Sequence, residues 1–204
     1  MRIHVKRFVL LQEEAFMRKI LSLSLLAVLF SFTPAIAAEG PYLGAGAVYN
    51  DPVSSDINDI KPAYGYDFKL GYNFGTFALE GNIIGSSHGD KLQGFGTADF
   101  SGFSLDARIF ASPFDDPNQF YFLIGLGAYS IDQFNPSYGD TTLDGSGFNF
   151  GAGLEHYFND RISLNVGVLY RIIKYDEFDV GGRAYSANIK GDTLSVETGL
   201  NFHF

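Results

Sequence analysis

Few side chains in this sequence could do chemistry. The 204 residues include no cysteine and only four histidines, which excludes disulfides and thiolate metal sites. His88 directly follows Ser86 and Ser87, and a histidine beside a serine can activate the hydroxyl for acyl transfer. A lone histidine next to serine in a loop is nevertheless common. The sequence therefore predicts no catalytic residue, no cofactor and no metal site.

A second set of polar residues is spread along the chain and has a regular setting. Each member is an acid or a base whose immediate neighbours are mostly apolar or glycine, so that it lies on the polar face of an alternating segment. Brought together inside a closed sheet, these charges would pair and fill the interior. The members are Asp67, Lys69, Glu80, Asp106, Arg108, Glu155, Arg171 and Glu197.

The segments that carry these charges alternate strictly between apolar and polar residues. Eight such strands of roughly ten residues are recognisable, and the connections between them are alternately long and short. This pattern predicts an all-β fold, an eight-stranded antiparallel up-and-down transmembrane β-barrel with long external loops and short periplasmic turns. The long loops are expected near residues 51–62, 86–98, 131–146 and 174–191.

Aromatic residues gather at both ends of the apolar faces, as in the interface girdles of membrane barrels. In the external loops, further aromatic residues would suit contact with a partner surface. These loop residues are Phe134, Tyr138, Phe178 and Tyr185.

The amino-terminal segment has the features of a secretory signal. A basic pair, Arg18-Lys19, precedes an apolar run from Ile20 to Phe32 and the small-x-small sequence Ala35-Ile36-Ala37. We therefore expect residues 17–37 to be a signal peptide, residues 1–16 to be a mis-assigned upstream extension, and residues 38–204 to be the barrel. The net charge of −9 argues against a nucleic-acid partner.

The last strand ends the chain on alternating aromatic residues. Glu197, Gly199, Phe202 and Phe204 together resemble the assembly signal of bacterial outer-membrane barrels. Residues 38–204 as a whole resemble the OmpA-like, OmpX-like and opacity-protein group of small eight-stranded barrels. The resemblance implies a bacterial outer-membrane location, contact with membrane lipid and lipopolysaccharide, and delivery by the barrel-assembly machinery.

For function, the resemblance implies a monomer that stabilises the envelope and displays loops able to bind an external ligand. Two alternatives remain. A small ion-conducting channel would use voids beside inward glycines such as Gly125 and Gly151, whereas an outer-leaflet lipid-modifying enzyme would use His88.

One tight turn also predicts a charge pair. If Phe74-Gly75 is a two-residue hairpin loop, Asn73 lies opposite Thr76 and Lys69 lies opposite Glu80. Arg108 on the following strand could join this pair.

Overall fold

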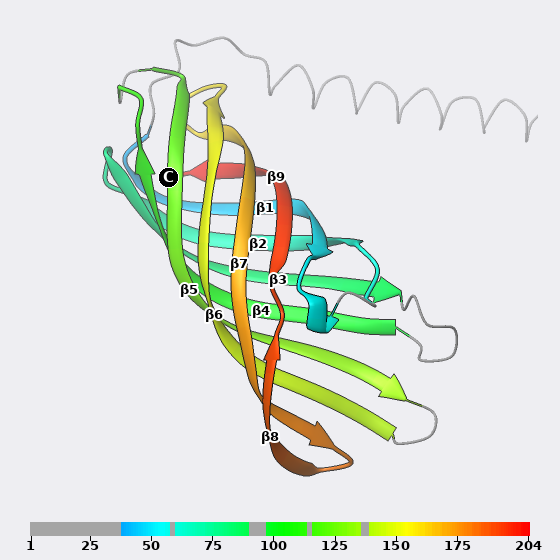
Figure 1. Cartoon of the computed structure of the whole chain (residues 1–204). Helices are drawn as coiled ribbons and strands as arrows, with labels where there is room; N and C mark the ends of the chain where they lie inside the picture. Colours follow the sequence, from blue (N-terminus) through cyan, green and yellow to red (C-terminus); the bar gives the residue numbers. More distant parts are fainter. Residues whose placement is uncertain (1–37, 58–59, 90–96, 114–115, 136–138) are drawn as a thin grey trace, which may run out of the picture. The chain divides into compact units, whose positions relative to one another are not determined.

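The computed structural model describes residues 38–57, 60–89, 97–113, 116–135 and 139–204 (Figure 1). The predicted signal peptide and upstream extension lie outside these residues. No helix in the described part is long and apolar enough to cross a membrane. The elements there are β1 (Gly40–Pro52), the short 3₁₀ helix η1 (Ser55–Ile57), β2 (Ala63–Asn73), β3 (Phe77–Gly89), β4 (Thr97–Phe110), β5 (Asn118–Asn135), β6 (Gly139–Tyr157), β7 (Ile162–Val180), β8 (Arg183–Lys190) and β9 (Thr193–His203).

The strands close on themselves. Each of β1 to β7 pairs antiparallel with its sequence neighbour, β9 pairs with β7 on one side, and β9 pairs with β1 on the other. Among the described strands, β8 pairs with β7 alone, at the outer end of β7, and stands outside the ring. The ring therefore has eight strands, which confirms the predicted up-and-down barrel.

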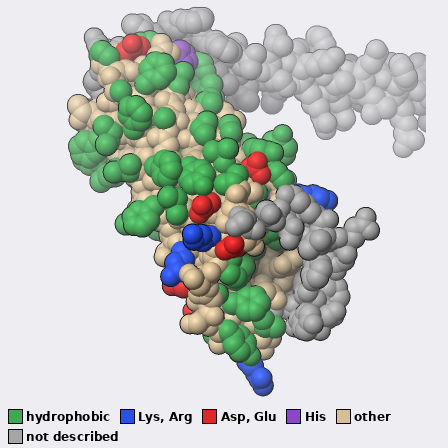
Figure 2. All heavy atoms as spheres, in the orientation of Figure 1, with side chains coloured by type: hydrophobic (Ala, Val, Ile, Leu, Met, Phe, Trp, Pro, Cys, Tyr) green, Lys and Arg blue, Asp and Glu red, His purple; other side chains and the backbone are tan. Residues whose placement is uncertain are grey.

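The two faces of the barrel wall differ as the alternation predicts. On β2, Phe68 is 54% exposed and Leu70 is 63% exposed, whereas Lys69 between them is only 5% exposed. Figure 2 shows hydrophobic side chains spread over the upper part of the outer surface, with charged groups gathered lower down. A wall that is apolar outside and polar inside fits a barrel whose solvent is lipid.

Three strands are much longer than the predicted ten residues. Strand β5 has 18 residues, and β6 and β7 have 19 each. The expected loops at 131–146 and 174–191 are thus largely paired strand, which corrects the sequence prediction. Pairing continues past the apolar band, which is the stretch of outward apolar residues on each strand. Each added residue pairs its backbone N–H and C=O groups in the ladder. At the end of β7, Gly181 and Gly182 both have positive φ, which suits a tight hairpin turn.

The predicted register between β2 and β3 is wrong. Asn73 lies opposite Ala78, Lys69 opposite Asn82, and Glu80 opposite Gly71. The loop is Gly75-Thr76, closed by a hydrogen bond from Phe74 N–H to the Phe77 carbonyl. Gly75 is the first of the two loop residues and has a φ of 91°. Hairpin turns with glycine at this position require such a positive φ. The glycine thus shifts the register by two residues from the predicted one.

This turn provides a stability test. Replacing Gly75 by Ala forces a side chain into a left-handed backbone and should destabilise the folded barrel by about 1–2 kcal/mol, measured by urea unfolding in lipid vesicles. The matched control is Gly81→Ala, because Gly81 has no positive φ and an added Cβ would meet its nearest atom at 3.6 Å. Equal effects of the two substitutions would contradict the turn assignment.

Candidate functional site

The barrel interior holds the predicted charges, and Arg108 is the centre of one group. Its side chain is fully buried, with Nε 2.9 Å from Glu80 Oε2 and Nη1 3.2 Å from Glu155 Oε2. The guanidinium also lies 4.6 Å from the centre of the Tyr121 ring. The Tyr42 hydroxyl donates to Glu80 over 2.7 Å. Arg108, rather than Lys69, is thus the basic partner of Glu80.

A second group surrounds Glu197 on β9. Lys69 Nζ lies 2.7 Å from Glu197 Oε2 and 3.1 Å from Asp67 Oδ2. Arg171 Nη2 lies 3.1 Å from the other oxygen, Glu197 Oε1. One carboxylate therefore joins cations from β2 and β7, whose strands are not neighbours in the ring.

Asp106 differs from the other predicted members. It lies within salt-bridge distance of no base in the described residues, and it accepts hydrogen bonds from Ser104, Asn82 and Asn149. His203 is not among the predicted charges, yet its Nε2 lies 3.5 Å from Glu155 Oε1. Ser163 hydrogen-bonds both His203 and Glu155. The alternation of inward and outward residues along each strand could have identified His203, and likewise Asn82, Ser104 and Asn149, as members of this network.

The Ser–His pair considered for catalysis does form, but inside the barrel. Ser86 Oγ lies 2.7 Å from His88 Nε2, and His88 Nδ1 lies 2.8 Å from the Lys61 carbonyl oxygen. Both side chains are buried. Ser87 is exposed on the opposite face of β3. Because the paired hydroxyl faces the interior, a lipid outside the wall cannot reach it.

The part of the chain that the structure describes contains no second candidate centre. His156 lies on the outward face, with its Nδ1 2.8 Å from Asn118 Oδ1. Among the described residues, no group of three or more His, Cys, Asp or Glu side chains is arranged to hold a metal ion.

A polar chain connects the Ser–His pair to the charge network. Asn50 Nδ2 donates to Ser86 Oγ over 2.9 Å, and Ser195 Oγ donates to Asn50 Oδ1 over 2.6 Å. Arg171 in turn hydrogen-bonds Ser195. Residues of β1, β3, β7 and β9 are thus linked across the interior by side chains alone.

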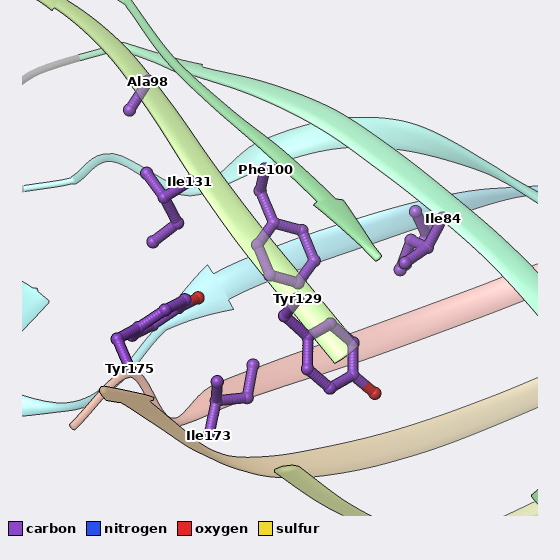
Figure 3. Close-up of a cluster of buried hydrophobic side chains, with 8 residues drawn as sticks. Ile84, Ala98, Phe100, Tyr129, Ile131, Ile173 and Tyr175 are labelled. Atoms are coloured by element: carbon purple, nitrogen blue, oxygen red, sulfur yellow. The ribbon is translucent and has the colours of Figure 1, made fainter. Parts of the chain in front are cut away.

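The outer end of the barrel interior also contains a layer of apolar side chains. Figure 3 shows the buried side chains that we call the mouth cluster, in which the Phe100 and Tyr129 rings stack with centroids 5.7 Å apart. This layer fills the interior beyond the charges, so the interior is packed at two levels. The mouth cluster consists of Val48, Ile84, Ala98, Phe100, Tyr129, Ile131, Ile173 and Tyr175.

The residues of the predicted assembly signal lie on both faces of β9. Glu197 points inward into its ion pairs, whereas Phe202 and Phe204 are exposed outward and their rings meet edge to face at 5.1 Å. A Cβ on Gly199 would lie 2.9 Å from the Ala45 carbonyl oxygen, so glycine permits close approach at the β1–β9 seam. Recognition by assembly machinery stays a prediction.

Comparison with known proteins matches this architecture. The family described as "Outer membrane protein beta-barrel domain" matches residues 23–202. No curated protein sequence matches the chain. Neisserial surface protein A is similar in structure at a TM-score of 0.62 and 15% identity, covering 82% of this chain and 99% of that one.

Two further solved structures agree. OprG from Pseudomonas aeruginosa has a TM-score of 0.61 at 15% identity, covering 85% of this chain and 99% of its own. Ail, the attachment invasion locus protein of Yersinia pestis, has a TM-score of 0.54 at 15% identity, covering 81% and 99%. At these identities the likeness shows a shared fold.

The Arg108–Glu80 contact can be measured by a double-mutant cycle. Arg108→Met alone leaves buried carboxylates unpaired and should cost roughly 3–5 kcal/mol of unfolding free energy. The cycle with Glu80→Gln should give a coupling energy of about 1–3 kcal/mol in urea unfolding. The control cycle pairs Lys69→Met with Glu80→Gln and should couple more weakly, because Lys69 contacts Glu197 and Asp67. Stronger coupling in the control would contradict the observed pairing.

His88 gives the outer end of the barrel a pH dependence. It lies beyond the apolar band, beside the exposed residues Ser87 and Gly89. Burial lowers the pKa of His88 below its ordinary value of 6.5, although the Lys61 carbonyl and the Asp99 carboxylate act in the opposite direction. As the pH falls through 6.5, the opened state takes up a proton before the closed state does, so the closed arrangement loses stability.

We therefore expect acid to open the contact between His88 and residue 61. Hydrogen exchange of the Lys61 amide, which donates to the Gly89 carbonyl, should accelerate between pH 7.5 and pH 5.5 after correction for intrinsic exchange. His88→Gln should abolish this additional acceleration. The same pH dependence in both proteins would assign it to another group.

Proposed function

This chain belongs to the outer membrane protein beta-barrel family and is a bacterial outer-membrane protein, and from that premise we propose that it displays a binding surface for a protein outside the cell. The barrel would act as a monomeric anchor held by membrane lipid and lipopolysaccharide and delivered by the assembly machinery. The display surface would be the projecting ends of β5 to β8.

The observation that carries this proposal is the length of the paired strands beyond the apolar band. Outward apolar residues end at Phe148 on β6 and at Ile172 on β7, yet both strands continue for several residues. Figure 1 shows β5, β6, β7 and β8 extending beyond the rest of the ring. Such a paired extension keeps its shape in water and is a rigid platform for contact with another surface.

Strand β8 offers the most open part of this platform. It ends the strand order, and its residues from Arg183 to Ser186 are all exposed. Phe178 and Tyr185, two of the predicted aromatic contacts, lie opposite each other across β7 and β8, and Tyr185 is 52% exposed. Aromatic residues on a rigid, exposed element are typical of protein interfaces. Tyr138 lies outside the described residues.

The charge of the display surface favours a neutral or basic partner. Its outward and terminal carboxylates outnumber the neighbouring bases Lys174, Arg183 and Lys190, so a polyanion would be repelled. Ail of Yersinia pestis was solved in complex with the heparin analogue sucrose octasulfate. We infer a different partner chemistry for this chain. The carboxylates are Asp132, Asp144, Asp176, Glu177 and Asp179.

The two alternatives have less support. An ion channel needs a continuous aqueous path, whereas the ion-paired layer and the mouth cluster both occupy the interior. An outer-leaflet enzyme needs a nucleophile that faces lipid, whereas the hydroxyl bonded to His88 belongs to the inward Ser86.

Shortening one hairpin tests the display function. Tyr175 and Ile189 already face each other, so replacing residues 176–188 with Asn-Gly should leave a two-residue turn and an intact barrel. Cells that carry the parent protein should adhere to at least one neutral or basic protein in an immobilised panel, and the shortened variant should lose that adhesion.

The control is Asp160→Ala in the turn at the opposite end, which should leave adhesion unchanged. Folding is checked by the shift between unboiled and boiled samples on SDS gels. Equal adhesion by the shortened and parent proteins, or adhesion to heparin alone, would contradict the proposal.

A further inference from the structure

The mouth cluster encloses a cavity at the outer end of the barrel. The cavity has a volume of about 10 Å³, which is enough for a single water molecule. The wall is almost entirely apolar. Its main residues are Ile57, Ile60, His88, Phe100, Ile131 and Tyr175.

Tyr175 brings an unpaired polar atom to this apolar wall. Tyr175 is 0% exposed, and its hydroxyl has no hydrogen-bond partner among the described residues. Figure 3 shows the hydroxyl pointing from the ring toward the other members of the cluster. A phenylalanine would fill the same space without burying an unpaired hydroxyl, which is costly. Packing alone therefore does not explain a tyrosine at this position.

Two residues of the segment that joins β1 to β2 belong to the lining of the cavity. Ile57 of η1 is 6% exposed, and Ile60 packs against the mouth cluster. Backbone hydrogen bonds hold the segment at its two ends, and the Ser54 and Asp56 side chains bond to the backbone of Lys190. Val53 N–H donates to the Asp192 carbonyl over 2.9 Å, and Lys61 N–H donates to the Gly89 carbonyl over 2.8 Å.

Two apolar side chains of the segment make a different kind of contact. Ile57 and Ile60 reach the cavity as aliphatic groups beside Phe100 and Tyr175, and an apolar molecule could replace such contacts. Because the free space holds one water, a larger molecule can enter only when these two side chains move aside.

From these observations we propose that the outer mouth of the barrel binds a small, uncharged, mainly apolar molecule that carries one hydrogen-bond acceptor. The acceptor accepts a hydrogen bond from the Tyr175 hydroxyl, the apolar part packs on Phe100 and Ile131, and Ile57 and Ile60 occupy the site when it is empty. A charged molecule is excluded because the apolar lining would remove its hydration and supplies no opposite charge. This site is independent of the proposed display surface.

The test uses two probes of similar size, one with an acceptor and one without. Protein purified from outer membranes is placed in lipid nanodiscs, and binding of 4-fluoroacetophenone and of fluorobenzene is followed by ¹⁹F NMR against empty nanodiscs. We expect 4-fluoroacetophenone to bind the protein more tightly than fluorobenzene. Tyr175→Phe should weaken 4-fluoroacetophenone binding by roughly 3- to 10-fold and leave fluorobenzene unchanged.

A second variant tests the covering side chains. Ile57→Ala combined with Ile60→Ala removes the groups that compete with the molecule, so both probes should bind more tightly. Phe148→Ala on the lipid-facing wall is the matched control and should change neither affinity. Binding no different from that of empty nanodiscs, an unchanged affinity in Tyr175→Phe, or an unchanged affinity in the double variant would overturn the proposal.

Discussion

A sheet edge left open within a bilayer would expose unpaired N–H and C=O groups to hydrocarbon, and the rest of this structure depends on avoiding that exposure. The seam between β1 and β9 removes the last edge by pairing Tyr42 through Pro52 with His203 through Thr193. Gly46 and Gly199 face each other in this seam, where the backbones approach closely. Closure then turns one set of alternate residues toward lipid and confines the other set inside.

Confinement explains the composition of the interior. Charges removed from both water and lipid are stable only as pairs with further hydrogen bonds, and Arg108, Lys69 and Arg171 each have carboxylate partners from other strands. The ion pairs hold β2, β3, β4, β6, β7 and β9 together across the lumen. Nearer the outer end the interior becomes apolar, where the mouth cluster is stabilised by packing instead.

The outer end is also where the wall ceases to be constrained by lipid. The ladder of β5, β6 and β7 continues outward. Beyond the last residue of β7 that pairs with β9, strand β8 takes the place of β9 as the partner of β7. Freed from the requirement of closure, β8 can remain an exposed edge. Polar β7 and β8 residues thus reach solvent, whereas Ile60, in the segment after β1, packs against the mouth cluster and Ile57 lines the cavity there.

The sequence by itself determined the barrel, its strand order and whether a strand residue faces inward or outward, because side chains alternate between the two faces of a strand with a period of two residues. It therefore placed Lys69, Glu80 and Arg108 correctly in the interior. Only the tertiary structure decided which of them meet. A two-residue shift at Gly75 preserves parity, so alternation could not distinguish the registers, and the contacts across the lumen depend on closure. Strand length was likewise undetermined, because polar residues pair in a ladder as readily as they form loops.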